Sequence, residues 1–407
     1  MQTNLADFIK GTADGDEAES ILRACVHCGF CTATCPTYQV LGDELDGPRG
    51  RIYLIKQVLE GAEVTRKTQL HLDRCLTCRN CESTCPSGVK YGRLVDIGRK
   101  VVEQRVARPL GERIARTLLK EALPRKWIFK PAFAAGRLVR PLLSPTLQDK
   151  LPRVAPPGRR PTRTHARKML VLEGCVQPAM APNINAAAAR VLDACGVELV
   201  TAPKEGCCGA LRFHMNDQDG GLDDMRRNID AWWPLIEQVE AIVMTASGCG
   251  VTVKEYGHLL RHDSAYAAKA ERISSMTRDL SEIVPEFEAA LAERLRGKIA
   301  GRVAWHPPCT LQHGQQIRGK VEGVLRAAGV DVVLCADSHL CCGSAGTYSV
   351  LQPALSHELR DRKLANLTAT GAQEIVSANI GCLTHLQSGT ETPVTHWIEL
   401  LDRALKR

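Results

Sequence analysis

Residues 25–36 read CVHCGFCTATCP, and residues 75–86 read CLTCRNCESTCP. Both stretches follow the pattern C-x2-C-x2-C-x3-C-P, and each cysteine of the first has a counterpart 50 residues later in the second. Three thiolates at this spacing can wrap around one four-iron cluster, while the following Cys-Pro carries a fourth thiolate away from it. Zinc sites also use C-x2-C pairs, but they rarely use three evenly spaced cysteines plus Cys-Pro, twice over. The duplication therefore predicts two [4Fe–4S] clusters within one small unit.

The fourth cysteine of each motif is expected to ligate the cluster of the other motif, as it does where two such clusters lie in one domain. This crossed assignment gives one cluster Cys25, Cys28, Cys31 and Cys85, and gives the other cluster Cys75, Cys78, Cys81 and Cys35. Between the motifs, Gly47-Pro48 predicts the start of a helix, and residues 94–106 predict another. We expect His27 and His71 to be surface or packing residues.

A second duplication with a longer period fills the rest of the chain. Its first copy holds Cys175, Cys207, Cys208 and Cys249, and its second holds Cys309, Cys341, Cys342 and Cys382, at offsets of 134, 134, 134 and 133 residues. Apolar, strand-like runs precede these cysteines and helical stretches lie between them, which predicts parallel α/β sheets. The loops at the carboxyl ends of such strands form sites. One or two additional iron–sulfur clusters are therefore a hypothesis for these repeats, with structural thiols or zinc as the alternative.

Composition bounds the class of protein. The chain has 407 residues, 44% of them hydrophobic, and 18 cysteines, without an apolar run long enough to span a membrane or a visible signal peptide. We therefore expect a cytoplasmic protein whose thiols bind metal instead of forming disulfides. The predicted architecture is multidomain: an α-helical, dicluster ferredoxin-like domain over residues 1–104, a basic Pro-rich segment over 105–168, and duplicated α/β units with parallel sheets over 169–292 and 293–407.

The segment 105–168 differs from the rest in charge. It holds 17 Lys and Arg against 3 Asp and Glu, whereas the whole chain has a net charge of only +8. Its prolines predict an exposed linker. Trp127, Phe129 and Phe133 lie among five of its cations, Arg125, Lys126, Lys130, Arg137 and Arg140. Docking on a membrane surface, docking on a protein partner and a merely solvated linker are the three interpretations.

The repeats resemble the CCG domain of heterodisulfide reductase and related redox subunits. That family's pattern ends in C-x-x-C, but here Thr252 and His385 stand where the last cysteine would be. The resemblance thus implies a cluster site without its fifth thiolate. His385 has two interpretations, a ligand or proton relay and a helix-surface residue. Cys195 and Cys335 have no counterpart in the other repeat, and we expect them to be buried apolar residues.

Residues 20–400 resemble the family of iron–sulfur subunits of glycolate oxidase, also called glycolate dehydrogenase. The resemblance rests on both cysteine motifs with their flanks, on NIDAWWP (228–234), TASGCGVTVKEYG (245–257) and DSHLCCGSAGTY (337–348), and on IVSANIGC (375–382). It implies a non-catalytic electron-transfer subunit, with FAD-binding partner subunits that oxidise glycolate to glyoxylate. It also implies delivery of electrons to quinone at the cytoplasmic face of the inner membrane. Oxidation of D-lactate and the anaerobic glycerol-3-phosphate dehydrogenase system are the nearby alternatives.

Motifs for nucleotide cofactors and for nucleophilic catalysis are missing from the sequence. It contains no G-x-G-x-x-G after a strand and no P-loop, so we expect no FAD on this chain and no catalytic residues. Oxidation of a 2-hydroxy acid removes two electrons at once, which a flavin can accept and release singly. A flavoprotein partner is therefore required. The competing class is a zinc-stabilised binding module, but the basic segment lacks the aromatic platform that single-stranded nucleic acid needs, and we expect no nucleic-acid partner.

Overall fold

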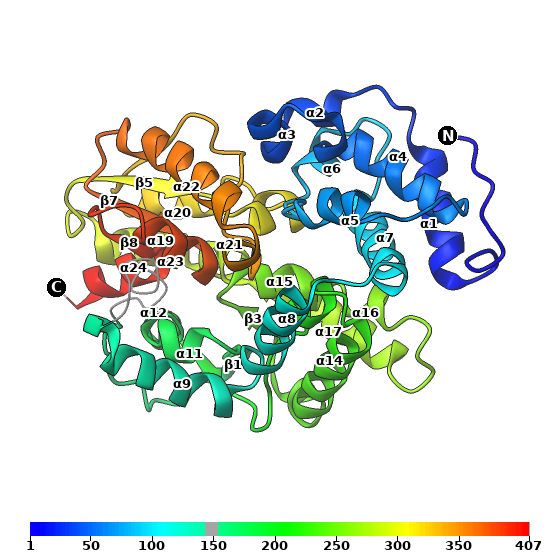
Figure 1. The fold of residues 1–407 in the computed structure, drawn as a ribbon. Coiled ribbons are helices and arrows are strands. Elements are labelled where there is room, and N and C mark those ends of the chain that lie inside the picture. The colour runs from blue at the N-terminus through cyan, green and yellow to red at the C-terminus, as the bar shows by residue number, and fades with distance from the viewer. Residues whose placement is uncertain (143–153, 407) are drawn as a thin grey trace. The chain divides into compact units, whose positions relative to one another are not determined.

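The computed structural model describes residues 1–142 and 154–406. The chain forms two compact units, each built from two stretches of sequence. The first unit comprises Met1–Thr117 and His339–Lys363, and the second comprises Leu118–Ser338 and Leu364–Arg407. Figure 1 shows the elements of both units.

Helices joined by short loops make up the first unit. They are α1 (Ala13–Ala24), α2 (Phe30–Ala33), α3 (Pro36–Leu41), η1 (Glu44–Asp46), α4 (Pro48–Leu59), α5 (Arg66–Asp73), α6 (Asn80–Thr84), α7 (Tyr91–Arg105) and α21 (Tyr348–Leu351). Two further helices, α8 (Leu110–Ala122) and α22 (Pro353–Thr368), begin in this unit and continue into the second.

The core of the first unit lies between α4 and α7. Pro48 opens α4, where a missing backbone N–H costs nothing, so the helix expected from Gly47-Pro48 is confirmed. Ile55 of α4 and Leu94 of α7 are fully buried. Gly98 lets the two helices approach closely, because a Cβ atom there would meet Ile55 Cγ1 at 2.6 Å. This packing provides the rigid base on which the cysteine loops rest.

Two parallel sheets of four strands confirm the predicted duplicated α/β architecture in the second unit. The first sheet has the order β2-β1-β3-β4 and the second has the order β6-β5-β7-β8, so each strand occupies the same place in both copies. The strands are β1 (Arg167–Val171), β2 (Val197–Val200), β3 (Ile242–Met244), β4 (Thr277–Asp279), β5 (Arg302–His306), β6 (Asp331–Leu334), β7 (Glu374–Ser377) and β8 (Val394–His396).

Helices connect these strands and cover the sheets. They are α9 (Lys126–Leu138), η2 (Arg140–Leu142), α11 (Gln177–Met180), α12 (Asn183–Ala194), α13 (Ala210–His214), α14 (Gln218–Trp232), η3 (Trp233–Gln238), α15 (Ser247–Lys254), α16 (Tyr256–Leu259), α17 (Ala267–Met276), α18 (Leu280–Ile283), η4 (Val284–Phe287), α19 (Glu288–Leu295), η5 (Thr310–Gly314), α20 (Lys320–Ala327), α23 (Ile380–Gln387) and α24 (Trp397–Leu405).

The two repeats of the second unit join through buried hydrogen bonds. His396, at the end of β8, places its Nε2 atom 3.0 Å from the carbonyl oxygen of Thr245, which follows β3. Burial lowers the pKa of His396 to about 3, so the ring is neutral and Nε2 donates to that oxygen. The Ser247 N–H donates to Ala378 O at 3.0 Å, and Arg190 of α12 pairs with Asp402 of α24 at 2.7 Å. The repeats therefore form one body.

The basic segment departs from the expected linker. It forms α8 and α9, while residues 154–165 have no helix or strand, and residues 143–153 lie outside the described part. Figure 1 shows α9 beside α11, and Phe133 of α9 is buried. Proline signals alone predicted a linker here, but burial of Phe133 stabilises a helix that contains Pro131. Across the described ranges, none of the helices combines the length and the apolar character that a membrane span requires.

Candidate metal centres

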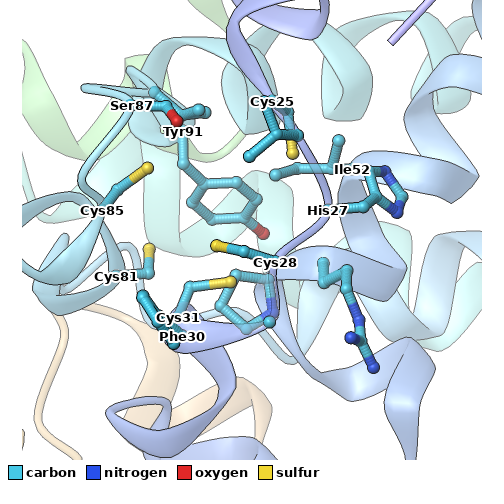
Figure 2. Close-up of a pocket in the computed structure, with 15 residues that line it drawn as sticks. Cys25, His27, Cys28, Phe30, Cys31, Ile52, Cys81, Cys85, Ser87 and Tyr91 are labelled. Carbon is cyan, nitrogen blue, oxygen red and sulfur yellow. The ribbon is translucent and has the colours of Figure 1, made fainter.

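One cavity of the first unit gathers cysteines from both motifs. Cys25, Cys28 and Cys31 of the first motif line it together with Cys85 of the second. Figure 2 shows these sulfur atoms around one space, with Tyr91 and Ile52 in the wall. Cys81 also contributes to that wall. Cys28 is exposed, so this cavity reaches the surface.

A second cavity holds the complementary set. Cys75, Cys78 and Cys81 line it together with Cys35 of the first motif. Among the described residues that line the two cavities, sulfur is abundant and no carboxylate is present, which suits iron–sulfur clusters. The grouping agrees with crossed ligation, and the ligation itself stays a prediction. The structure therefore brings together all eight cysteines in the two predicted sets.

Left-handed backbone conformations turn the three cysteines of each motif toward one side. His27 and Thr77, 50 residues apart, have φ angles of 57° and 52°. Gly29 and Arg79, also 50 residues apart, have φ angles of 86° and 59°. A side chain at Gly29 would in addition meet the Arg49 guanidinium, because a Cβ atom there lies 2.8 Å from Nη1. The loop shape thus repeats in the second motif although a non-glycine residue takes the position of Gly29.

A buried polar network surrounds Cys35. The Sγ atom of Cys35 lies 3.3 Å from Thr37 Oγ1, which accepts from Arg51 Nη1 at 3.1 Å. Arg51 also contacts the fully buried carboxylate of Asp46 at 3.3 Å, and Arg74 reaches the same carboxylate at 2.8 Å. Hydrogen bonds and charges near the sulfurs set the potential of such a cluster. The cysteine spacing carried no signal for these residues.

His71 belongs to this network. Its Nδ1 atom lies 3.1 Å from Asp46 Oδ1, and its side chain is buried. It therefore packs in the interior, which is one of the two roles expected for it. His27 is partly exposed beside the first cavity, and burial together with the charge of Arg49 lowers its pKa. Its ring is therefore neutral at pH 7.

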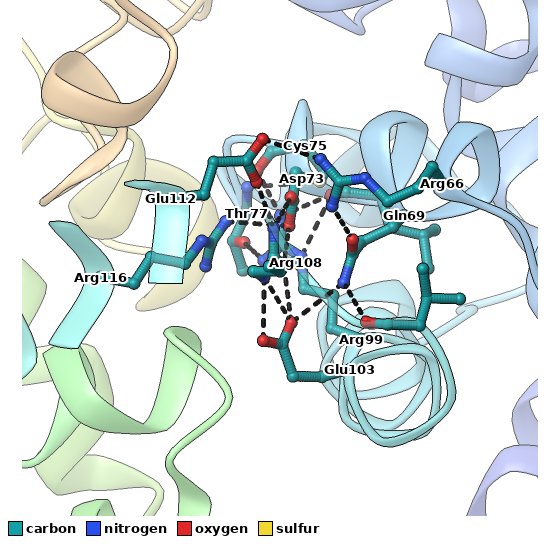
Figure 3. A network of polar contacts seen from close by, with 12 residues as sticks. Arg66, Gln69, Asp73, Cys75, Thr77, Arg99, Glu103, Arg108, Glu112 and Arg116 are labelled. Atoms are coloured by element: carbon teal, nitrogen blue, oxygen red, sulfur yellow. Dashed lines mark hydrogen bonds and ion pairs between the residues drawn. The ribbon is translucent and has the colours of Figure 1, made fainter. Parts of the chain in front are cut away.

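Arginine side chains also stabilise the loop that carries the second cysteine motif. Arg99 Nη2 donates to the carbonyl oxygens of Leu72 and Cys75 at 2.8 and 2.6 Å. Figure 3 shows the adjoining network, in which Arg108 contacts Asp73 at 2.6 Å and Glu103 at 2.6 Å. Burial alone would raise the pKa of Asp73, but the hydrogen bond and charge of Arg108 lower it below the usual value. Asp73 is therefore ionised and holds the loop through its salt bridges.

The first α/β repeat brings its four predicted cysteines together. The side chains of Cys175 and Cys208 lie beside that of Cys207, and the side chain of Cys249 lies beside that of Cys208, close enough for each to shift the pKa of its neighbour. Cys175 follows β1, the Cys207-Cys208 pair follows β2, and Cys249 lies in the first turn of α15 after β3. The prediction that these cysteines lie at the carboxyl ends of parallel strands is therefore confirmed for this repeat.

Neighbouring thiols of this set have pKa values that shift in opposite directions. The side chains of Cys175 and Cys208 lower the pKa of Cys207 well below its usual value. The side chain of Cys207, with burial, raises the pKa of Cys175. Asn228 donates to the carbonyl oxygen of Cys207 at 2.7 Å and Tyr256 donates to that of Cys208 at 2.8 Å. The polar contacts thus fix the backbone of the cysteine pair.

Among the described residues of this repeat, no cysteine stands at the fifth position of the CCG pattern. Thr252 occupies the position of the missing cysteine, is buried, and donates through Oγ1 to Gly248 O at 3.2 Å. Its hydroxyl group is therefore used in a hydrogen bond to the backbone of its own helix.

Two buried carboxyl groups lie near this set of cysteines, and the sequence patterns did not indicate them. Burial raises the pKa of Glu205 and of Asp224, and the Cys207 thiolate adds to the rise at Asp224.

The second repeat distributes its cysteines between the two units. Cys309 and Cys382 belong to the second unit, and Cys341 and Cys342 belong to the first. A ring nitrogen of His306, which ends β5, lies within 4.8 Å of Cys382 Sγ. His306 is 1% exposed and was missed, although WHPPC places it three residues before Cys309. His385 is buried, so its helix-surface interpretation is wrong, and a ligand role stays a hypothesis.

The Cys341-Cys342 loop lies against the second cysteine motif within the first unit. Asn80, next to Cys81, donates to His339 O at 3.2 Å, and Tyr348 donates to Arg74 O at 3.1 Å. The amide of Gly343 donates to Cys341 Sγ at 3.4 Å. Thiols of the second repeat are therefore neighbours of the second cavity. The remaining two cysteines differ, since Cys335 is buried as expected whereas Cys195 is only half-buried.

These features define a class of protein that carries iron–sulfur clusters and transfers electrons. Comparison with known families supports the class. Residues 21–89 match the 4Fe-4S dicluster domain, and residues 169–254 and 303–387 match a cysteine-rich domain called CCG. The chain is 54% identical over 409 residues to the glycolate oxidase iron-sulfur subunit of Escherichia coli (strain K12), with all of both chains covered. The chain belongs to the family of glycolate oxidase iron–sulfur subunits.

More distant relatives share parts of the chain. A probable glycolate oxidase iron-sulfur subunit of Bacillus subtilis (strain 168) is 31% identical and covers 92% of this chain and 90% of its own length. Lactate utilization protein A of Geobacillus thermodenitrificans is 23% identical over 58% of this chain and 98% of its own length. A hypothetical protein of Helicobacter pylori has a similar fold, with a TM-score of 0.55 over 97% of this chain and 73% of its own at 11% identity.

Proposed function

We propose that this chain is the electron-transfer subunit of a glycolate-oxidising complex and that it passes electrons from FAD-binding subunits to quinone. The observation that carries the proposal is the pair of cavities lined by Cys25, Cys28, Cys31 and Cys85 and by Cys35, Cys75, Cys78 and Cys81. These residues would hold two [4Fe–4S] clusters, which supply one-electron transfer. The full-length identity to an E. coli glycolate oxidase subunit supports glycolate as the donor. The relatives named for lactate utilization make D-lactate the second candidate.

The flavin partner docks, in this proposal, where the first cavity reaches the surface. Cys28 is exposed there, and the neighbouring side chains of Val26 and Phe30 are 67% and 61% exposed. Tyr53 packs edge-on to His27 beside them and is 47% exposed. Exposed apolar side chains gathered in one place mark interaction surfaces. Electrons would enter at Cys28 and leave on the side of the second cavity, where Asn80 contacts the Cys341-Cys342 loop.

Reconstitution tests the proposed function. The chain with intact clusters is expected to reduce no dye with glycolate until the FAD-binding subunits are added. Phe30→Asp should reduce transfer from those subunits at least tenfold, because a charge would be buried at the interface (about 2 kcal/mol or more). Leu41→Asp, at an apolar residue exposed elsewhere in the first unit, is the control. Glycolate-dependent dye reduction by the isolated chain would refute the division of labour.

A membrane position follows from the acceptor, because quinone is lipid-soluble. On α9, Trp127 and Leu138 lie 11 residues apart, which returns them to one face, and they are 75% and 84% exposed. Phe133 is buried against the protein, and the exposed cations Lys130 and Arg137 lie along one side of the exposed face. Apolar side chains set among cations suit the headgroup boundary of an anionic bilayer. We therefore propose that the complex is peripheral to the inner membrane through this face.

Vesicle flotation tests the membrane proposal. The complex should float with vesicles that contain anionic phosphatidylglycerol and should be released as salt rises, because charged contacts are screened. Replacement of Lys126, Lys130 and Arg137 by Gln should weaken binding at least tenfold, since each cation contributes about 1 kcal/mol near the surface. The same replacements at Arg261, Arg272 and Lys298 give the control. Unchanged flotation of the α9 variant would place the membrane contact elsewhere.

A further inference from the structure

A cavity of about 350 Å³ lies in the second unit, apart from the clustered thiols described above. It sits between the segment that follows β5, the end of β6 and the first turn of α20. Pockets at the carboxyl ends of parallel strands commonly hold ligands, and this volume falls in the range of small-molecule sites. Its apolar wall comprises Trp305, Pro307, Leu311, Ile317, Val321 and Leu334.

Glu322 is a second, independent feature of the cavity. It lines the cavity and is 8% exposed, yet it has no hydrogen bond or ion pair to any described residue. Its carboxyl oxygens are not fully buried, so they can form hydrogen bonds with a ligand in the cavity. Two cations that line the cavity, Lys320 and Arg326, are exposed and do not pair with it. The carboxyl group is therefore open to a ligand.

The charges of the wall select the class of ligand. Glu322 disfavours a ligand that places an anionic group beside its carboxylate, and Arg318, Lys320 and Arg326 disfavour a cation. A neutral ligand with hydrogen-bonding oxygens satisfies both. The first amide groups of α20, at Lys320 and Val321, have no intrahelical partner and can donate to a carbonyl oxygen. A flat ring suits the apolar wall around Trp305.

We propose that this cavity binds the ring of a quinone and is where the chain delivers its electrons; the proposal rests on the proposed function. Cys309 of the second repeat lies in the chain two residues from Pro307 and two residues from Leu311, both of which line the cavity. Reduction of a quinone to a quinol takes two electrons and two protons. Glycolate supplies the electrons through the flavin and the iron–sulfur clusters. Water supplies the protons, one of them through the Glu322 carboxyl group to a quinone oxygen.

Photolabelling of the assembled complex with an azidoquinone tests the site directly. The label should map by mass spectrometry to residues 305–338. Leu334→Trp should decrease labelling at least tenfold, because Leu334 lines the cavity at 45% exposure and a larger ring would block its rim. Val350→Trp is the matched control, since Val350 is 49% exposed and lies outside the cavity. Label that maps elsewhere, or labelling that Leu334→Trp leaves unchanged, would overturn the proposal.

Kinetics separate this proposal from the proposed function. In the complex, Leu334→Trp should lower the ratio of quinone reduction to dye reduction at least tenfold. Glu322→Gln keeps the shape but cannot relay a proton, so it should lower that ratio and shift its pH profile while azidoquinone labelling persists. A complex that reduces neither dye nor quinone with glycolate would refute the proposed function instead. An unchanged ratio in both variants, with active dye reduction, would refute the cavity alone.

Discussion

Cys35→Ser is expected to remove the cluster at Cys75, Cys78 and Cys81 and to leave the cluster at Cys25 in place. The reason is that Cys35 lines the second cavity, although it lies in the first motif. Serine cannot supply a thiolate, and three remaining sulfurs hold a four-iron cluster poorly. The iron content should fall by about four atoms per chain, or by about one if a three-iron remnant persists. EPR spectra of the dithionite-reduced protein should lose one of two cluster signals.

The mirror variant sharpens this test. Cys85→Ser should remove the signal that Cys35→Ser leaves, because Cys85 lines the first cavity. Cys195→Ser serves as the control, since Cys195 is half-buried and lies outside both cavities. Crossed ligation is wrong if Cys35→Ser instead abolishes the signal that depends on Cys28. The exposed Cys28 makes that signal assignable, because Cys28→Ser perturbs the first cavity with little effect on packing.

The cysteines of the first α/β repeat are expected to bind a third iron–sulfur cluster. After anaerobic reconstitution the chain should hold at least about twelve iron atoms, the content of three four-iron clusters. The physical reason is the convergence of Cys175, Cys207, Cys208 and Cys249, whose side chains lie close enough to shift one another's pKa. The double variant Cys207→Ser, Cys208→Ser should lose about four iron atoms and the matching acid-labile sulfide.

Cys335→Ser is the control for this loss, because Cys335 is equally buried but stands outside the repeated pattern. A parent chain that binds only about eight iron atoms would show that these cysteines are structural. Loss of iron in the Cys335 variant would instead indicate general damage to the fold. Zinc bound in place of iron would favour the alternative that the cysteines of the repeats form a zinc site.

Cysteine spacing was sufficient to predict the groups at the two cavities of the first unit. The reason is chemical, because a four-iron cluster restricts both the number and the spacing of its thiolates. The parallel sheets were equally predictable, since each cysteine follows an apolar run such as MLVLEG (169–174). Both predictions used patterns of residues that are close in the sequence, and such residues stay close to one another in the folded chain.

Contacts between distant residues could not be predicted in this way. Arg51 approaches Thr37 and His71 only after α4 packs on its neighbours, and nothing in its flanking residues marks it. Arg79 adopts the conformation of Gly29 although its residue type argues against a positive φ angle. His385 was assigned a surface alternative because a lone histidine on a helix carries no sign of burial. Tertiary packing decided each of these cases.

The first unit is complete only after residues 339–363 pack against residues 1–117. During synthesis the two cysteine motifs emerge early, whereas Tyr348, which bonds to Arg74, leaves the ribosome much later. A ribosome adds about 5–20 residues per second, so the contact with residues 339–363 cannot form for on the order of tens of seconds. Nascent thiols such as Cys75 thus spend that interval without their final cover. An amino-terminal fragment that ends at residue 104 would never make this contact. Its second cluster would therefore be more exposed to solvent than in the whole chain, and electrochemistry on the isolated ferredoxin-like fragment would report that difference.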